Sequence, residues 1–232
     1  MKLLKILFYG ELGAGKTTLA HALASHAGKQ GVAALEFNLD ATAHSLKQQP
    51  FFDVRKTELG REASEEKNPD RAAEKVFCKQ LLEDKAVRNA LAQAEREGAK
   101  LALFDSNASP SFFLSASVRE FTSGFFDRLV LVSDAGFMKE GDENFEFVKA
   151  LGGFASAATG LPLTVVLNKI DLACRKEEKQ KTLSGGEGER KPLKKRMNSL
   201  NALARNVALT RASGWERIGL NELLDALETQ AP

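Results

Sequence analysis

The sequence predicts an α/β fold, with a mostly parallel central sheet and helices on both of its faces. Short apolar runs rich in β-formers alternate with segments of helical periodicity, which is typical of parallel strands buried on both faces. Hydrophobic residues make up 43% and charged residues 28% of the 232 residues, so a sizeable core can be buried. Length and composition together favour one domain with an insertion over two separate domains.

Six apolar runs are expected to be strands, and six periodic segments are expected to be helices. The strands are expected at Leu3–Phe8, Val32–Leu39, Leu101–Phe104, Leu129–Val132, Leu163–Leu167 and Val207–Leu209. The helices are expected at Lys16–Gln30, Pro69–Gly98, Ser111–Phe125, Asn144–Thr159, Leu193–Ala204 and Leu220–Glu228. This alternation implies a doubly wound sheet with right-handed crossovers. Ligands of such sheets bind beyond the carboxyl ends of the strands.

The domain is expected to span residues 1–232, with two interruptions of the strand–helix alternation. A charged helical insertion is expected at about 51–98, between the second and third strands. A flexible charged loop is expected at about 173–192, where Lys, Arg and Glu are frequent and glycines lie close together.

Charge and cysteine content argue against several classes of protein. The net charge of +2 is too small to indicate nucleic acid or a membrane surface as a partner. No apolar stretch approaches the ~20 residues of a membrane span. Cys78 and Cys174 are far apart and form neither a metal-ligand cluster nor a disulfide framework. A cytoplasmic protein is therefore expected.

A glycine-rich segment after the first strand predicts a phosphate-binding loop. Residues Gly10-Glu11-Leu12-Gly13-Ala14-Gly15-Lys16-Thr17 match the pattern G-x-x-x-x-G-K-[ST] between a strand and a helix. Glycines let backbone N–H groups approach phosphates, and the helix N-terminus favours negative charge. The pattern predicts the three-layer P-loop NTPase fold, with Lys16 on the β- and γ-phosphates and the Thr17 hydroxyl on Mg²⁺. Nucleotide contacts are expected from Gly10, Gly13, Ala14, Gly15, Lys16, Thr17 and Thr18.

Two acidic residues at strand ends are candidate metal ligands and catalytic residues. Asp105 follows Leu101–Phe104 as a Walker B aspartate does, and Asp40 follows the second strand. With Thr17 they would hold Mg²⁺, which binds few carboxylates besides phosphates and waters. Asp40 is also a candidate to orient the attacking water, and Lys16, Asp40 and Asp105 form the expected catalytic set. Alternatively, an aspartate at a strand end caps the next helix.

A four-residue pattern after the fifth predicted strand points to guanine as the base. Asn168-Lys169-Ile170-Asp171 matches N-K-x-D. A carboxylate at Asp171 would accept hydrogen bonds from N1–H and the exocyclic amine of guanine, whereas adenine has no N1–H. Lys169 would lie over the base, and Asn168 would tie the loops together. Thr210 and Arg211, after the last predicted strand, are weaker candidates for a contact to the guanine oxygen.

These residues resemble the GPN-loop GTPases, a family of the SIMIBI class of P-loop GTPases that also includes the signal recognition particle GTPases. The resemblance covers most of the chain. Its further segments are Asn38-Leu39-Asp40, Phe52-Asp53-Val54-Arg55, Phe112-Phe113-Leu114, Val132-Ser133-Asp134 and Leu167-Asn168-Lys169. The resemblance implies a Mg²⁺-dependent GTPase that works as a homodimer.

Two departures from this family fall on the hydrolytic machinery. Asn68-Pro69-Asp70 stands where the family carries Gly-Pro-Asn, the tripeptide that reaches the nucleotide of the partner subunit. Asp105-Ser106-Asn107-Ala108-Ser109 replaces the family's Asp-Thr-Pro-Gly-Gln, so the glycine that senses the γ-phosphate and the glutamine are both missing. The departures predict slow hydrolysis by a divergent member of the family.

Three functions remain open from the sequence. The first is a GTP-binding, slowly hydrolysing dimeric switch or assembly factor, whose protein client no residue identifies. The second is a P-loop kinase for a small molecule, although such a kinase has no use for Asn-Lys-x-Asp. The third is a pseudo-GTPase scaffold, which the residues after Asp105 favour over the kinase.

Overall fold

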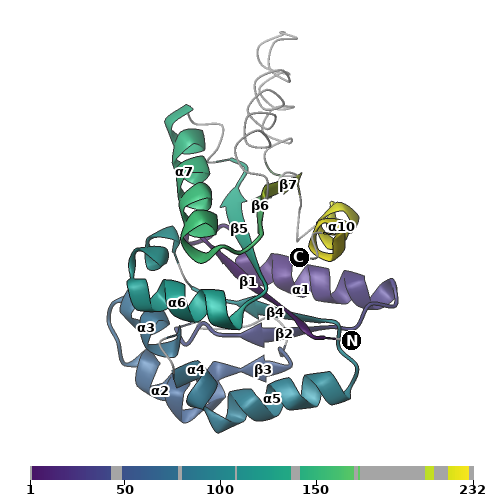
Figure 1. The fold of residues 1–232 in the computed structure, drawn as a ribbon, viewed down its shortest axis with the longest axis vertical. Helices are drawn as coiled ribbons and strands as arrows, with labels where there is room; N and C mark the ends of the chain where they lie inside the picture. Colours follow the sequence, from purple (N-terminus) through teal and green to yellow (C-terminus); the bar gives the residue numbers. More distant parts are fainter. Residues whose placement is uncertain are drawn as a thin grey trace.

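Seven parallel strands form one sheet within the residues that the structure describes. The structure is a computed structural model, and these residues are 2–42, 49–77, 80–107, 109–136, 142–169, 172, 207–211 and 219–229. The strand order is β3-β2-β4-β1-β5-β6-β7 (Figure 1), and each neighbouring pair is parallel. The predicted three-layer α/β fold is confirmed.

All six predicted strands are present, and a short seventh was not predicted. The strands are β1 (Leu4–Gly10), β2 (Ala34–Asn38), β3 (Phe52–Asp53), β4 (Leu101–Asp105), β5 (Arg128–Asp134), β6 (Leu163–Asn168) and β7 (Val207–Arg211). The α-helices are α1 (Lys16–Lys29), α2 (Glu58–Ser64), α3 (Pro69–Phe77), α4 (Gln80–Glu83), α5 (Lys85–Arg96), α6 (Ala116–Phe125), α7 (Asp142–Thr159) and α10 (Leu220–Thr229). Two 3₁₀-helices, η1 (Val54–Lys56) and η2 (Pro110–Leu114), complete the described elements.

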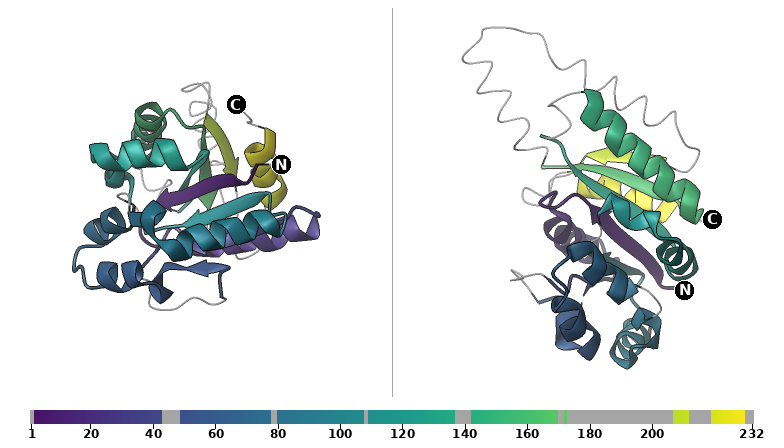
Figure 2. Two further views of the ribbon diagram at one scale, coloured as in Figure 1. Left: turned by 60° about the horizontal axis from the view of Figure 1, so that its bottom comes forward. Right: turned by 90° about the vertical axis from the view of Figure 1, so that its left-hand side faces the viewer.

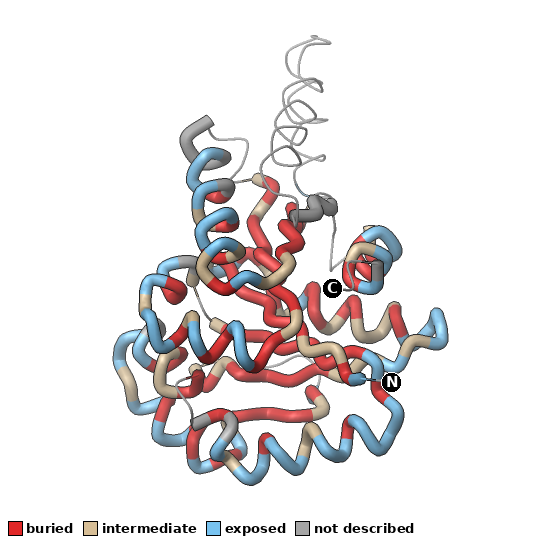
Figure 3. The backbone as a smooth tube through the Cα atoms, viewed as in Figure 1, coloured by how far each residue is buried: buried red, intermediate tan, exposed pale blue. Residues whose placement is uncertain are grey.

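Two hydrophobic cores lie on opposite faces of the sheet. Along β1, Ile6 and Phe8 belong to the core beneath α1 and α10, whereas Leu7 and Tyr9 belong to the core that includes residues of α3, α5, α6 and α7. The three layers are visible in Figure 2. Strands β1 to β6 are buried along most of their length, and the outer faces of the helices are exposed (Figure 3). Burial on both faces explains why the strand sequences are continuously apolar.

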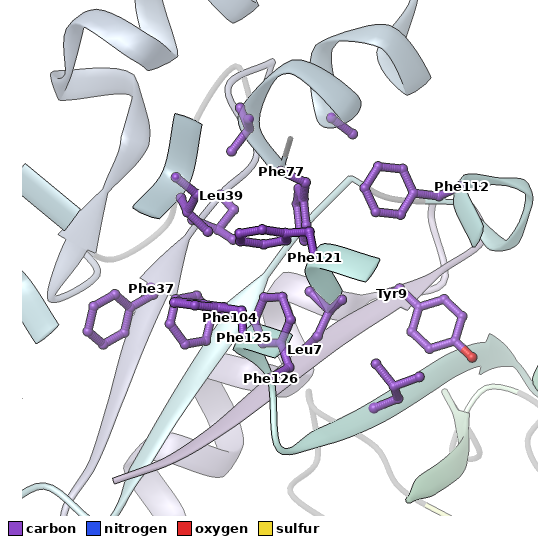
Figure 4. Packing of buried hydrophobic residues seen from close by; sticks show 14 of the residues in the cluster. Leu7, Tyr9, Phe37, Leu39, Phe77, Phe104, Phe112, Phe121, Phe125 and Phe126 are labelled. Atoms are coloured by element: carbon purple, nitrogen blue, oxygen red, sulfur yellow. The ribbon is translucent and has the colours of Figure 1, made fainter. Parts of the chain in front are cut away.

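Phenylalanine rings fill the larger core directly behind the end of β4. The Phe104 ring stacks on Phe37 at 4.8 Å between centroids and meets Phe126 edge-on at 5.2 Å (Figure 4). Phe125 and Phe126 meet edge-on at 4.8 Å, and Phe121 stacks on Phe125. Such pairs contribute beyond their buried area. The cluster thereby packs tightly around Phe104, the residue before Asp105.

The predicted helix over Pro69–Gly98 is wrong in its continuity. The structure divides it into α3, α4 and α5. The Asp84 carboxylate accepts hydrogen bonds from the N–H groups of Ala86 and Val87 at 2.7 and 3.2 Å, which makes it the N-cap of α5. An aspartate satisfies otherwise unpaired N–H groups at a helix start, so a new helix begins here inside the periodic pattern.

The predicted helix over Ser111–Phe125 is also divided. The chain first forms η2 and then α6, with Ser115 in an extended conformation between them. The predicted helix at Leu193–Ala204 and the predicted loop at 173–192 lie outside the described residues.

None of the described helices is both long enough and apolar enough to cross a bilayer.

Replacing Phe104 by alanine should lower the free energy of unfolding by about 3–5 kcal/mol, because a fully buried ring leaves a cavity. Urea denaturation followed by circular dichroism measures the change. Phe154, which is 39% exposed on α7, is the matched control, and its alanine variant should lose only about 1 kcal/mol. Equal losses in the two variants would contradict the packing around Phe104.

Candidate nucleotide-binding site

The carboxyl ends of four strands bring most of the predicted site residues to one edge of the sheet. Gly10 ends β1, Asp105 ends β4 and Asn168 ends β6, while Asn38 ends β2 two residues before Asp40. Asn38 is in register with Asp105, and Phe8 of β1 is in register with the same aspartate. Parallel register therefore places the phosphate loop beside the end of β4.

Glycine is required at two positions of the phosphate loop by close neighbours and at a third by backbone conformation. A side chain at Gly10 (φ 145°) would collide with the Val132 carbonyl oxygen. A Cβ at Gly15 (φ 89°) would lie 2.6 Å from Asn168 Nδ2. Gly13 has no close neighbour, but its φ of 79° is left-handed, which residues with a side chain rarely adopt.

Asn168 binds the phosphate loop directly. Its Nδ2 donates hydrogen bonds to the carbonyl oxygens of Ala14 at 2.9 Å and Gly15 at 3.4 Å. The side chain is buried, so losing these bonds would leave the amide without partners at substantial cost. Asn168 therefore connects the end of β6 to the phosphate loop.

Lys169 leaves β6 in a left-handed conformation, with φ of 60°. Its Nζ donates a hydrogen bond to Asp134 Oδ2 at 2.9 Å, and its Cε would lie 3.7 Å from a Cβ at Gly15. The stem of the lysine therefore runs beside the phosphate loop. Ile170 and Asp171 lie outside the described residues, as does any contact that Asp171 makes.

Asp134 and Glu11 belong to this site, although the sequence alone assigns no contact to either. Asp134 ends β5 in register with Asn168, and its Oδ1 accepts the N–H of Gly136 at 2.7 Å while Oδ2 pairs with Lys169. Glu11 accepts a long hydrogen bond from the Ser133 hydroxyl at 3.5 Å, and burial raises its pKa. The detectable signal for Asp134 was its place two residues after the predicted strand Leu129–Val132.

The Lys16 side chain is hydrogen-bonded to the backbone of the phosphate loop. Its Nζ donates to the carbonyl oxygens of Gly10 at 3.0 Å and Glu11 at 3.1 Å. Burial lowers the pKa of the ammonium, while the charges of Asp105, Asp40 and Glu11 counteract this. The ammonium is thus positioned where phosphate oxygens would replace two neutral carbonyls as acceptors.

Asp105 is a buried carboxylate without a normal hydrogen bond to any described residue. Burial raises its pKa to about 7, although the nearby Thr17 hydroxyl and Lys16 lower it. Glu36 and Asp40 raise it further. A buried charge is costly unless it is paired, and Mg²⁺ prefers oxygen ligands such as this carboxylate and the Thr17 hydroxyl. The donor set therefore fits Mg²⁺, with Asp105 and Thr17 as the residues placed to hold it.

One carboxylate oxygen of Asp40 is hydrogen-bonded within the turn that follows β2. Its Oδ1 accepts the N–H of Thr42 at 2.8 Å and the Thr42 hydroxyl at 2.7 Å. These are the contacts of an aspartate in a turn, and not those of the helix cap that the sequence offered as the alternative. The charge of Asp40 nevertheless acts on both Lys16 and Asp105, so it lies within the electrostatic reach of the site.

Asn38, at the end of β2, is hydrogen-bonded to Asp53 at the end of β3. Its Nδ2 donates to Asp53 Oδ1 at 2.9 Å, and Arg55 forms an ion pair with Asp53 at 2.6 Å. Burial alone would raise the pKa of Asp53, but hydrogen bonds from Arg55 and Asn38 lower it overall. Asp53 and Arg55 therefore connect the start of the 51–98 segment to the end of β2.

The two residues that follow Asp105 make local contacts. The buried Ser106 hydroxyl donates to the Phe8 carbonyl oxygen at 2.8 Å, across to β1. Asn107 Nδ2 donates to the Thr42 hydroxyl at 3.4 Å, which joins this segment to the turn after Asp40. Ala108 lies outside the described residues.

The remaining predicted site residues lie in the first turn of α1, at the start of α3 and at the end of β7. Thr18 is exposed in the first turn of α1. Asn68 accepts the Arg71 N–H at 3.3 Å and so caps α3, whose first residues are Pro69 and Asp70. Thr210 and Arg211 end β7 in register with Val166 and Leu167 of β6. This register puts their backbone at the same sheet edge as Asn168.

Replacing Asp105 by asparagine should stabilise the ligand-free protein at pH 8. The pKa of Asp105 is about 7 in the folded protein and about 3.8 in the unfolded protein. The unfolded protein therefore loses this proton first, and the free energy of unfolding falls as the pH rises between these two values. The variant avoids this fall and should gain up to about 4 kcal/mol at pH 8, with the difference shrinking towards pH 4. Urea denaturation without Mg²⁺ or nucleotide measures it. The exposed Glu95→Gln is the control; a pH-independent effect of Asp105→Asn would contradict the assigned pKa.

Solved structures share this fold. A GTPase from Pyrococcus abyssi in its apo form matches with a TM-score of 0.67 at 19% identity, over 97% of this chain and 96% of that chain. The signal recognition particle receptor FtsY from Elizabethkingia anophelis matches with a TM-score of 0.52 at 13% identity, over 97% of this chain and 65% of that chain. At such identities the likeness shows the fold alone.

No curated protein sequence matches the chain. A family model does match, over residues 8–228, and that family is described as "conserved hypothetical ATP binding protein". The matched range runs from β1 to α10 and includes the phosphate loop, Asp105 and Asn168. The chain therefore belongs to this family of conserved hypothetical ATP-binding proteins.

Proposed function

We propose that this protein binds a guanine nucleoside triphosphate together with Mg²⁺ and hydrolyses it slowly. The observation that carries the proposal is the pair of hydrogen bonds from Asn168 to Ala14 and Gly15. They join Asn168, the first residue of the Asn-Lys-x-Asp segment, to the phosphate loop, which supports one site for the base and the phosphates. Neither motif alone would argue this strongly for a nucleotide of defined base.

The described side chains suit the phosphate end of such a ligand. The Lys16 ammonium would transfer its hydrogen bonds from the carbonyls of Gly10 and Glu11 to phosphate oxygens. Asp105 and Thr17 would hold Mg²⁺, which when bound supplies charge neutralisation at the β- and γ-phosphates. Backbone N–H groups at the start of α1 would bind the remaining phosphate oxygens.

Guanine is preferred over adenine in this proposal despite the description of the family as ATP-binding. Lys169 is held by Asp134 beside the phosphate loop, with Asp171 only two residues beyond it. An aspartate there would pair with the N1–H and exocyclic amine of guanine, and adenine would leave this carboxylate unmatched.

Slow turnover follows from the residues after Asp105. The Ser106 hydroxyl is occupied by the Phe8 carbonyl, and no glutamine stands in this segment. A pseudo-GTPase that retains nucleotide as a scaffold is the second candidate, which the same observation favours.

For the slowly hydrolysing GTPase, we propose the role of a cytoplasmic homodimeric switch or assembly factor, as in the GPN-loop family. The Asn68-Pro69-Asp70 segment would then approach the nucleotide of the partner subunit.

GTP should displace a fluorescent guanine nucleotide from the wild-type protein far better than ATP does. Lys16→Ala should weaken both triphosphates, since the lysine contacts phosphate. Asp171→Asn should instead exchange the base preference from GTP to XTP, because an amide matches the 2-oxo group of xanthine. Competition titrations with GTP, ATP and XTP in Mg²⁺ distinguish these effects. Equal affinity of the wild type for ATP and GTP would refute guanine selectivity.

Single-turnover hydrolysis should be much slower than the ~1 s⁻¹ at the lower end of ordinary enzymes. Phosphate release measures the rate of GTP hydrolysis. Light scattering with GDP or a non-hydrolysable GTP analogue measures the molecular mass of the protein in solution, and we expect the mass of a dimer with the analogue. Turnover above ~1 s⁻¹ would refute slow hydrolysis, recovery of intact GTP would favour the scaffold, and a monomer with every nucleotide would remove the homodimer.

A further inference from the structure

A histidine–glutamate pair lies on the α1 face of the sheet, one helical turn beyond Thr17. His21 follows Thr17 by four positions, a spacing that puts both side chains on the same side of a helix. His21 Nδ1 lies 3.1 Å from Glu36 Oε2 of β2. The Glu36 side chain is only 10% exposed and that of His21 32%. An ionised Glu36 is an acceptor, so the shared hydrogen bond has its proton on Nδ1.

Glu36 shares a sheet face with Asp105. Glu36 precedes Asn38 by two residues in β2, so their side chains point to the same face, and Asn38 is in register with Asp105 of β4. Leu103, the register partner of Glu36, belongs to the core beneath α1. The carboxylates of Glu36 and Asp105 are thus diagonal neighbours on the side that carries Thr17.

The two carboxylates interact through a low-dielectric interior. Glu36 and Asp105 are both buried, at 9% and 1% exposure, so little water screens the two carboxylates from one another. Burial raises the pKa of Glu36 itself, and the contact with His21 counteracts this. Charge that disfavours a second negative group equally favours a cation beside it. Glu36 therefore acts on the position where Mg²⁺ fits.

Stability alone does not account for this pair. The surrounding core contains Leu19, Leu23 and Leu103, and replacing buried charged partners by apolar residues of similar size is often neutral or stabilising. The pair does connect two elements of the site, because His21 is on the helix that positions Thr17 and Glu36 is on the strand that leads to Asp40.

We propose that His21 and Glu36 are positioning residues for Mg²⁺. Glu36 adds negative charge behind Asp105 and Thr17, and His21 holds that carboxylate in place from α1. Neither side chain contacts the nucleotide. The inference rests on the proposed Mg²⁺–nucleotide binding and adds two residues that strengthen the metal end of that site.

Glu36→Gln tests the proposal, because it removes the charge and keeps the size and an acceptor for His21. The dissociation constant of a fluorescent GDP is measured over a series of Mg²⁺ concentrations and again in EDTA. The variant should need about 10- to 100-fold more Mg²⁺ to reach half of the Mg²⁺-induced gain in GDP affinity. Losses of this size are typical when a residue that supports a metal ligand is removed. Its affinity in EDTA should equal that of the wild type. His21→Gln should shift the Mg²⁺ midpoint in the same direction by a smaller factor.

His26→Gln is the matched control, since His26 lies further along α1 and pairs with the Asn221 side chain at 2.6 Å. It should leave the Mg²⁺ midpoint unchanged. An unchanged midpoint in Glu36→Gln, or an equal loss of affinity with and without Mg²⁺, would overturn the positioning role. If Glu36→Gln does not fold, His21→Gln decides the question by the same two readouts. A wild type that binds no nucleotide would instead refute the proposed function, and the inference with it.

Discussion

The close approach of the phosphate loop to the ends of β5 and β6 is the constraint on which the site depends. The loop passes so near the Val132 carbonyl that only glycine fits at Gly10, and so near the Asn168 amide that only glycine fits at Gly15. The same proximity lets Asn168 bond to two loop carbonyls. The glycines are therefore needed both for phosphate approach and for contact between two segments at the sheet edge.

Charges at this edge are arranged around a position for a ligand. Lys16 is bonded to neutral carbonyls that are weaker acceptors than phosphate, and Asp105 is buried without a normal hydrogen bond to the described residues. Each group is less favourable in the ligand-free protein than it would be with an opposite charge beside it. Binding of a metal and a phosphate would remove both penalties together, so the two ligands are expected to strengthen one another's binding.

The fold and the main site positions could be predicted because each had a strong local pattern. Apolar runs marked the six longer strands, and strand ends located Asp105 and Asn168. β3 was missed because two residues carry no periodicity, and the break before α5 was missed because Asp84 sits inside a helical pattern. The ion pair of Asp134 with Lys169 and the contact of His21 with Glu36 depend on tertiary packing between segments remote in sequence. Spacing along the chain does not reveal such contacts.

The central position of β1 has a consequence for how the chain folds. Its neighbours β4 and β5 begin at Leu101 and Arg128, and the loop that follows β1 is bonded to Asn168, 154 residues beyond Ala14. Contacts of such long sequence separation form late and slow the folding of a domain. During synthesis, β1 remains without β4 until Asp105 has left the ribosome, and without β5 until Asp134 has done so. β1 is thus an apolar segment of the nascent chain that needs protection from aggregation.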